Sequence, residues 1–142
     1  MTGIARLGMF GLVLMAGGAW GQAGLQNVNS ELLVAARSGR VATVTALLEQ
    51  GANPDSRNRI GDTPLNTAAK KGDAAIVKLM LERGADVNLQ NASGVSPLMS
   101  AAYGGHADIV KLLLAHKADP TRVDRIMKTA TIYAAGDRKS VV

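Results

Sequence analysis

The chain has 142 residues and a formal net charge of +5, and apolar residues make up 47% of it. This length suits about one domain, and the apolar content is sufficient for a packed core. The absence of cysteine excludes disulfides, thiolate nucleophiles, cysteine-ligated zinc and iron–sulfur clusters. No run of basic residues is longer than two, so the positive charge does not indicate a nucleic-acid-binding protein.

The first residues have the layout of a secretory signal peptide. A short segment with one positive charge, residues 1–6, precedes an uncharged, mostly apolar stretch over residues 7–20. That stretch is shorter than the about 20 apolar residues that a membrane-spanning helix needs. Small residues follow it, so we predict a signal peptide over residues 1–23, cleaved near 21–23, and a short linker over 24–29. An uncleaved membrane anchor is the alternative.

Most of the remaining chain repeats with a period of 33 residues. Residues 61–72 match residues 94–105 at this offset, and the match continues with Ile-Val-Lys-Leu-Met-Leu at 76–81 against Ile-Val-Lys-Leu-Leu-Leu at 109–114. A fixed period of this length is the signature of a repeat architecture. A degenerate unit precedes the two full units and a truncated unit follows them. The predicted repeat domain spans residues 30–142, with units at 30–55, 56–88, 89–121 and 122–142.

The repeated residues resemble those of ankyrin repeats. Thr63-Pro-Leu-Asn and Ser96-Pro-Leu-Met stand where the family pattern has Thr-Pro-Leu-His, and Gly84-Ala-Asp-Val-Asn also fits that pattern. The resemblance covers roughly residues 29–142. It implies an all-α solenoid in which helix–turn–helix units stack and hairpin fingers project between them.

Each full unit carries the signals of two short helices. Thr63 and Ser96 can cap a helix start with their hydroxyls, and each is followed by a proline at the first helical position. Gly72 and Gly105 can end this helix, because glycine accepts a left-handed backbone. The apolar segments at 76–81 and 109–114 then predict a buried second helix, and the residues from Asp86 to Gly94 indicate an extended finger.

Four positions depart from the family pattern. Asn66 and Met99 replace the histidine to which the resemblance assigns a bond between repeat backbones; Asn66 can still make a polar bond, whereas Met99 cannot do so comparably. Lys117 replaces the glycine that ends the second helix, and Met127 replaces the turn glycine of the last unit. We therefore expect the least regular backbone near the C-terminus, where the truncated unit should fray or be covered by something else.

Neither the histidines nor the acidic residues form a catalytic motif. His106 occupies a recurrent Gly-His position between helices, where we expect a structural role. His116 lies on the surface at the end of a second helix, where a cation complements the helix dipole. No histidine pair has metal-ligand spacing, and no close acidic pair suggests acid–base chemistry. We predict that the protein is not an enzyme and uses no cofactor or metal.

The resemblance places partner contacts on a concave face made of the fingers and the outer side of each first helix. The variable positions there are mostly basic, and Tyr103 stands near their middle, where a tyrosine is favoured as a contact hot spot. A solvated charged face without a preferred ligand is the alternative. The predicted partner-binding residues are Arg37, Arg59, Ile60, Asp62, Lys70, Lys71, Ser93, Val95, Tyr103, Arg125 and Lys128.

These features favour a non-catalytic protein-binding module, an exported adaptor or accessory factor whose partner protein has an acidic surface. We expect a monomer that binds no nucleic acid and, after cleavage, no membrane. The periplasm is the expected location, and secretion is the second possibility. The alternatives are a secreted effector or an inhibitor or immunity-type protein, and a scaffold held at the inner membrane by the uncleaved N-terminus.

Overall fold

The computed structural model describes residues 20–136 and is helical, with no strand in that range. No helix in this part of the chain is both long and apolar enough to cross a bilayer. Residues 1–19 of the predicted signal peptide lie outside the described part of the chain. The helices are α2 (Trp20–Ser38), α3 (Val41–Glu49), α4 (Pro64–Lys71), α5 (Ala74–Glu82), α6 (Pro97–Tyr103), α7 (Ala107–Ala115) and α8 (Ala130–Gly136).

Residues 24–29, the predicted linker, are helical, and α2 runs through this segment without a break. The segment contains no proline, and Leu25 and Gln26 are good helix formers. Once the packed C-terminal half of α2 has formed, each residue added toward the N-terminus gains a hydrogen bond without a new nucleation step. The helix therefore extends beyond the stack instead of ending at the domain boundary.

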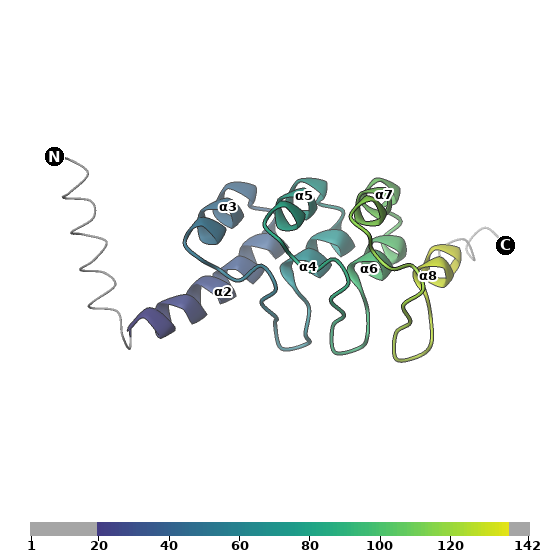
Figure 1. Ribbon diagram of the computed structural model, residues 1–142, viewed down its shortest axis with the longest axis horizontal. Coiled ribbons are helices and arrows are strands. Elements are labelled where there is room, and N and C mark those ends of the chain that lie inside the picture. The colour runs from purple at the N-terminus through teal and green to yellow at the C-terminus, as the bar shows by residue number, and fades with distance from the viewer. Residues whose placement is uncertain (1–19, 137–142) are drawn as a thin grey trace.

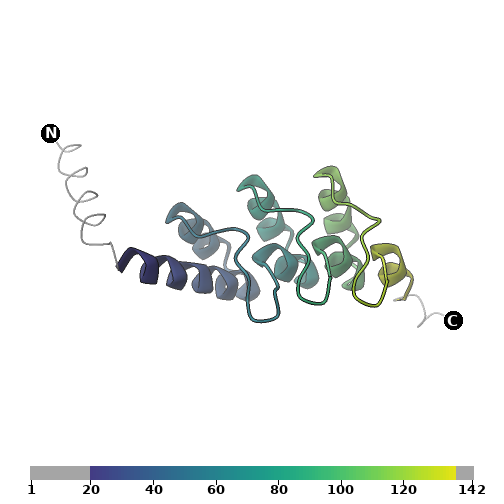
Figure 2. The same cartoon turned by 60° about the horizontal axis from the view of Figure 1, so that its bottom comes forward.

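The helices form two rows. Helices α2, α4, α6 and α8 pack side by side in one row, and α3, α5 and α7 lie on them in a second row (Figure 1). The connections 50–63, 83–96 and 116–129, here called fingers 1, 2 and 3, project on the side of the first row. Figure 2 shows the fingers following one another along α4, α6 and α8. This arrangement confirms the predicted all-α solenoid of stacked helix pairs.

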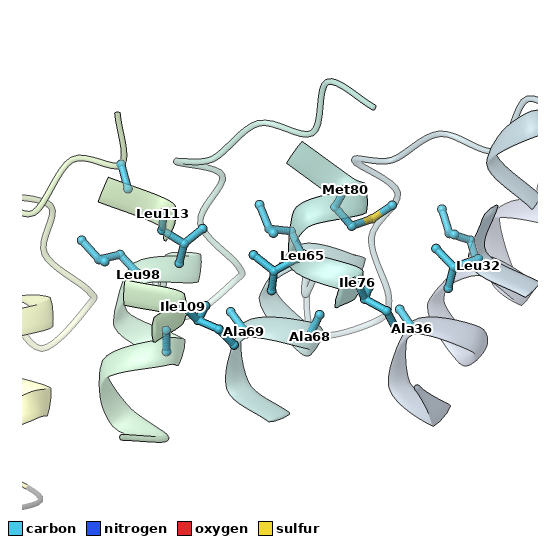
Figure 3. Close-up of a cluster of buried hydrophobic side chains, with 14 of the residues drawn as sticks. Leu32, Ala36, Leu65, Ala68, Ala69, Ile76, Met80, Leu98, Ile109 and Leu113 are labelled. Atoms are coloured by element: carbon cyan, nitrogen blue, oxygen red, sulfur yellow. The ribbon is translucent and has the colours of Figure 1, made fainter. Parts of the chain in front are cut away.

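The core consists of aliphatic side chains that recur at the repeat period. Leu32, Leu65 and Leu98 occupy equivalent positions and are all buried (Figure 3). Paired alanines follow each leucine, as in Ala68 and Ala69, which are fully buried and let neighbouring helices approach closely. The remaining buried aliphatic side chains of α5 and α7 are Ile76, Val77, Met80, Ile109 and Leu113.

One residue predicted in the core is outside it. Leu114 in α7 is 44% exposed, although the equivalent Leu81 in α5 is half-buried and packs against the core. Helix α5 is covered on this side by α7, whereas no described helix follows α7 in the second row. The exposure of Leu114 is therefore a consequence of its place at the end of that row.

The predicted helix caps are present. The Thr63 hydroxyl accepts a hydrogen bond from the Asn66 N–H at 3.1 Å, and the Ser96 hydroxyl accepts one from the Met99 N–H at 3.2 Å. Gly72 ends α4 with a left-handed φ of 86°. These contacts satisfy backbone groups that a helix leaves unpaired at its ends. They fix where each short helix begins and, with it, where each finger joins the stack.

The predicted backbone irregularities near the C-terminus are confirmed. Lys117 and Met127 have φ values of 65° and 63°, and they are the non-glycine residues with positive φ in the described chain. The residues at the equivalent positions of the preceding unit are Gly84 and Gly94, and both also have a positive φ. A side chain in this conformation costs roughly 1–2 kcal/mol, so both positions carry local strain.

Candidate partner-binding surface

Each finger is closed by one side chain at a fixed place in the repeat. In finger 2, Asn91 Oδ1 accepts hydrogen bonds from the N–H groups of Ser93 and Val95, both at 2.9 Å. Asn58 in finger 1 and Asp124 in finger 3 accept the equivalent pair of bonds at 2.8–3.0 Å. An Asx side chain that bonds its own turn in this way favours one loop conformation. The fingers are therefore ordered supports for the residues at their tips.

Backbone hydrogen bonds connect successive finger tips. The Ala92 N–H donates to the Ile60 carbonyl at 3.1 Å, and the Arg125 N–H donates to the Ser93 carbonyl at 3.0 Å. These bonds join finger 1 to finger 2 and finger 2 to finger 3. The tips consequently form one continuous surface that carries the predicted residues Arg59, Ile60, Ser93 and Arg125.

A second series of bonds joins the units where the fingers leave the second helices. The Asn53 N–H donates to Asn29 Oδ1 at 2.7 Å, the Asp86 N–H to Asp55 Oδ1 at 2.9 Å, and the Asp119 N–H to Asn88 Oδ1 at 2.7 Å. Sequence reasoning did not identify this series. The signal for it is the recurrence of an acceptor side chain at the repeat period, Asp55 and Asn88.

Asn66 connects α4 to finger 2 and to α6. Its amide donates to the carbonyls of Leu89 and Val95 at 3.4 and 3.3 Å, and its oxygen accepts from the Ser100 hydroxyl at 3.3 Å. The prediction that Asn66 makes a polar bond is thus confirmed. The equivalent Met99 is buried, and within the described residues it makes no hydrogen bond to finger 3.

A pocket lies between α4, α6 and α8 on the finger side of the stack. Four predicted residues meet there: Asp62, Lys70, Val95 and Tyr103. Its volume of about 240 Å³ is below the roughly 300–1,000 Å³ of most small-molecule sites. The pocket therefore has the size of a site for a side chain. Sequence reasoning missed Asn66, Asn91, Met99, Ser100 and Tyr133 as its other lining residues.

The sequence signal for Tyr133 is its position, 33 residues after the pocket residue Ser100. Its ring meets Tyr103 edge to face, with centroids 5.9 Å apart and an interplanar angle of 83°. The Lys128 ammonium lies 5.7 Å from the centroid of the Tyr133 ring. The last unit is therefore tied to the pocket, and α8 is helical from Ala130 to Gly136.

The Tyr133 hydroxyl donates a hydrogen bond to the carboxylate of Asp124. This bond, together with burial, raises the pKa of Tyr133 to about 12. The same bond lowers the pKa of Asp124, against the opposing effect of burial and with further help from the backbone N–H groups of Lys128 and Ile126. Each group thus favours the protonation state that keeps the hydrogen bond.

The cations predicted for this surface are exposed and form no ion pair within the described residues. Within residues 27–135 the ion pairs are Arg83 with Glu49 and Arg122 with Asp119, at 3.8 and 3.9 Å. Lys71 instead donates to a backbone carbonyl, that of Arg37. Of the predicted residues, the exposed cations outside these pairs are Arg37, Arg59, Lys70, Lys71, Arg125 and Lys128.

The other predicted residues differ in accessibility. Ile60 and Tyr103 are 61% and 62% exposed, and Ser93 is also exposed. Val95 and Asp62 are half-buried, and one Asp62 oxygen accepts a hydrogen bond from the Asn91 amide at 2.7 Å. The structure therefore brings Asp62, Lys70, Val95 and Tyr103 together at the pocket. Arg37 lies in the first unit, separated along the stack from Arg125 and Lys128 in the last. Lys128 is next to the pocket, because its ammonium lies beside the ring of the pocket residue Tyr133.

Both histidines occupy structural positions. His106 Nε2–H donates to the Lys70 carbonyl at 3.1 Å, and a Cβ atom on Gly72 or Gly104 would come within 2.6 Å of its ring. His106 thus joins two units through a space that the glycines leave open. The exposed His116 lies at the end of α7, and its Nδ1–H donates to the Leu112 carbonyl at 2.9 Å. No cluster of potential metal ligands occurs in the described part of the chain.

The comparisons with known proteins agree with this architecture. A comparison with curated proteins finds no match. The family model described as ankyrin repeats (3 copies) matches residues 32–124, which is more than half of the chain. Ankyrin repeats are in general modules for protein–protein interaction. The match begins at the first core leucine and ends at the Asx residue of finger 3, so the chain belongs to the ankyrin-repeat family.

Proposed function

We propose that the protein binds one partner protein, without catalysis, through its concave face. This face consists of fingers 1–3 and the outer side of α4, α6 and α8. The observation that supports this proposal is that six exposed cations on or beside this face form no ion pair among the described residues. A partner with an acidic surface would supply the missing charges. Complementary charge of this kind increases the association rate and sets specificity.

A protein surface fits this face better than a nucleic acid does. The cations are separated by apolar and neutral groups, including the exposed Ile60 and Tyr103 and the side-chain-sized pocket. Asp62 also places a negative charge in the middle of the face. Apolar contacts and a half-buried carboxylate suit a protein surface that has both apolar and charged groups. Binding to a phosphate backbone would instead favour a continuous row of cations.

The charge of the face provides the test. We would immobilise the full chain, capture its partner from the compartment in which it resides, and compare Lys70→Glu/Lys71→Glu with the wild type. The reversed charges should reduce binding by at least about tenfold, because attraction becomes repulsion. A matched control is Lys78→Glu/Lys111→Glu, which makes the same change of net charge at exposed positions on the second-row helices α5 and α7.

Two results would contradict the proposal. Unchanged binding of the Lys70→Glu/Lys71→Glu variant would show that the concave face is not used. An equal loss for Lys78→Glu/Lys111→Glu would show that the partner responds to net charge and not to this face.

We further propose that the protein is an exported monomeric adaptor or accessory factor of the periplasm. The charged, apolar and small-residue order of residues 1–23 supports export. N-terminal sequencing of the protein isolated from fractionated cells is the test. A mature chain that begins after Gly21 or Ala23 in the periplasmic fraction is the expected result. An intact N-terminus in the membrane fraction would favour the anchored scaffold instead.

A further inference from the structure

We infer that the pocket between α4, α6 and α8 receives one phenylalanine- or leucine-sized side chain from an acidic segment of the partner. A carboxylate beside that side chain pairs with Lys70. This inference rests on the proposed function and adds the chemistry by which the concave face recognises its partner.

Four of the nine residues that line the pocket supply apolar walls that are already in place. Val95, Met99, Tyr103 and Tyr133 supply aliphatic and aromatic surface from α6, α8 and finger 2. The edge-to-face contact between the two tyrosines holds the exposed Tyr103 ring. Burying an apolar side chain against a wall that is already ordered avoids part of the entropy cost of binding. Large exposed aromatic residues beside a pocket are also typical of interaction hot spots.

The polar groups of the pocket floor are engaged within the protein. Asn66 donates to two backbone carbonyls and accepts from the Ser100 hydroxyl, so both of its N–H groups are used. A polar ligand group would have to break these bonds, whereas an apolar group leaves them intact. The floor therefore favours an apolar occupant although two of its residues are polar.

The rim of the pocket has opposite charges along the length of α4. Asp62 precedes the first turn of α4, and Lys70 lies in its last turn. The Lys70 ammonium has no ion pair in the described chain, whereas Asp62 already holds the Asn91 amide. A ligand carboxylate is attracted at the Lys70 end and repelled at the Asp62 end. The partner segment should thus carry its acidic residues on one side of the apolar side chain.

The same charges argue against a second copy of this chain as the occupant. Two concave faces would bring together the exposed cations Arg59, Lys70 and Arg125 of each copy. Like charges across an interface cost several kcal/mol. An acidic segment of a different protein meets the same face with complementary charge.

Short synthetic peptides can test this inference without knowledge of the partner. The probe is a fluorescent peptide in which two glutamates precede one phenylalanine within a neutral serine–glycine sequence. One comparison peptide has alanine in place of phenylalanine, and another has serines in place of the glutamates. Affinity for the full chain is measured by fluorescence anisotropy at low salt. The complete probe should bind about tenfold or more tightly than either comparison peptide.

Two variants separate the apolar and the charged contributions. Tyr103→Ala removes a wall and should abolish the preference for phenylalanine over alanine while the preference for glutamate remains. Lys70→Gln keeps most of the side-chain stem and should abolish the preference for glutamate while the preference for phenylalanine remains. Lys111→Gln, at an exposed position on α7, is the matched control and should bind like the wild type.

Equal binding of the phenylalanine and alanine peptides would overturn the inference but leave the proposed function standing, because charge attraction alone would remain. Failure of every peptide to bind would also overturn it. The proposed function fails separately, if capture of the natural partner is insensitive to the charge of residues 70 and 71. Nuclear magnetic resonance shifts confined to the amides of α4, α6 and α8 on titration with the probe would support the assigned pocket.

Discussion

Tyr133 in α8 donates its hydroxyl proton to the carboxylate of Asp124, whose other oxygen closes finger 3. One carboxylate thereby joins the last described helix to the preceding finger. In the preceding unit the comparable link between helix and finger comes from Asn66, and Met99 cannot supply it for finger 3. The Tyr133–Asp124 bond therefore compensates for a link that the repeat has lost at its C-terminal end.

Replacement of Tyr133 by phenylalanine should release α8 from finger 3. The ring contact with Tyr103 can remain, but Asp124 loses the partner of its second oxygen. We expect the midpoint of thermal unfolding to fall by a few degrees, because one hydrogen bond to a charged group is lost. Amide hydrogen exchange should be faster than in the wild type in α8 and finger 3, with a smaller change in α4. Tyr103→Phe is the control, since the Tyr103 hydroxyl has no partner in the described chain.

The same bond predicts how stability depends on pH. The pKa of Asp124 is lowered in the folded state, so its contribution is present above its ordinary value of 3.8 and is lost as the pH falls through the folded pKa. The pKa of Tyr133 is raised from 10.0 to about 12, so its contribution is present below pH 10.0 and is lost as the pH rises toward 12.

Urea unfolding across this pH range measures both effects. The stability difference between the wild type and Tyr133→Phe should be largest between pH 5 and 9 (approximate limits from the two titrations) and should shrink on both sides. A difference that stays constant from acid to alkaline pH would show that the two groups do not interact in the folded protein.

Replacement of Lys117 by glycine should stabilise the stack. Lys117 has a φ of 65°, which glycine adopts without steric cost, and glycines occupy the two equivalent helix ends at Gly51 and Gly84. The relief of about 1–2 kcal/mol is offset in part by the larger backbone entropy of unfolded glycine, which leaves a gain of up to about 1 kcal/mol. Chemical denaturation measures the change. Lys111→Gly, inside α7, should instead lose about 1 kcal/mol. Equal losses for both variants would refute the strain assigned to Lys117.

The helix pairs and the positions with irregular backbone could be predicted because each has a recognisable pattern in the local sequence. The period places Leu65 and Ala68 in the core, and the missing glycine at Lys117 predicts its positive φ. Contacts between units are less evident from the sequence. The pocket role of Tyr133 depends on its direction toward Tyr103, and the exposure of Leu114 depends on which helix follows α7. The helical segment before residue 30 was missed because signal-peptide composition and helix propensity overlap there.

Substitution of Gly104 by alanine should strain the contact between the second and third units. Gly104 has an ordinary helical φ of −76°, so the effect is steric. The new Cβ would lie 2.6 Å from the His106 ring and 2.9 Å from the Lys70 carbonyl oxygen, which accepts the His106 hydrogen bond. We expect a loss of roughly 1–3 kcal/mol in urea unfolding, which is typical of overpacking.

A double-mutant cycle with His106→Ala distinguishes this clash from a general effect of alanine at the helix end. His106→Ala alone removes one hydrogen bond and leaves a space beside Gly72 and Gly104. In that background the Gly104→Ala substitution should cost less than it does in the wild type, because only the carbonyl contact remains. The two changes are in direct contact, so a coupling of about 0.5–3 kcal/mol is expected. Strictly additive losses would show that His106 is not seated against Gly104, and the bridge from His106 to Lys70 would then not hold the units together.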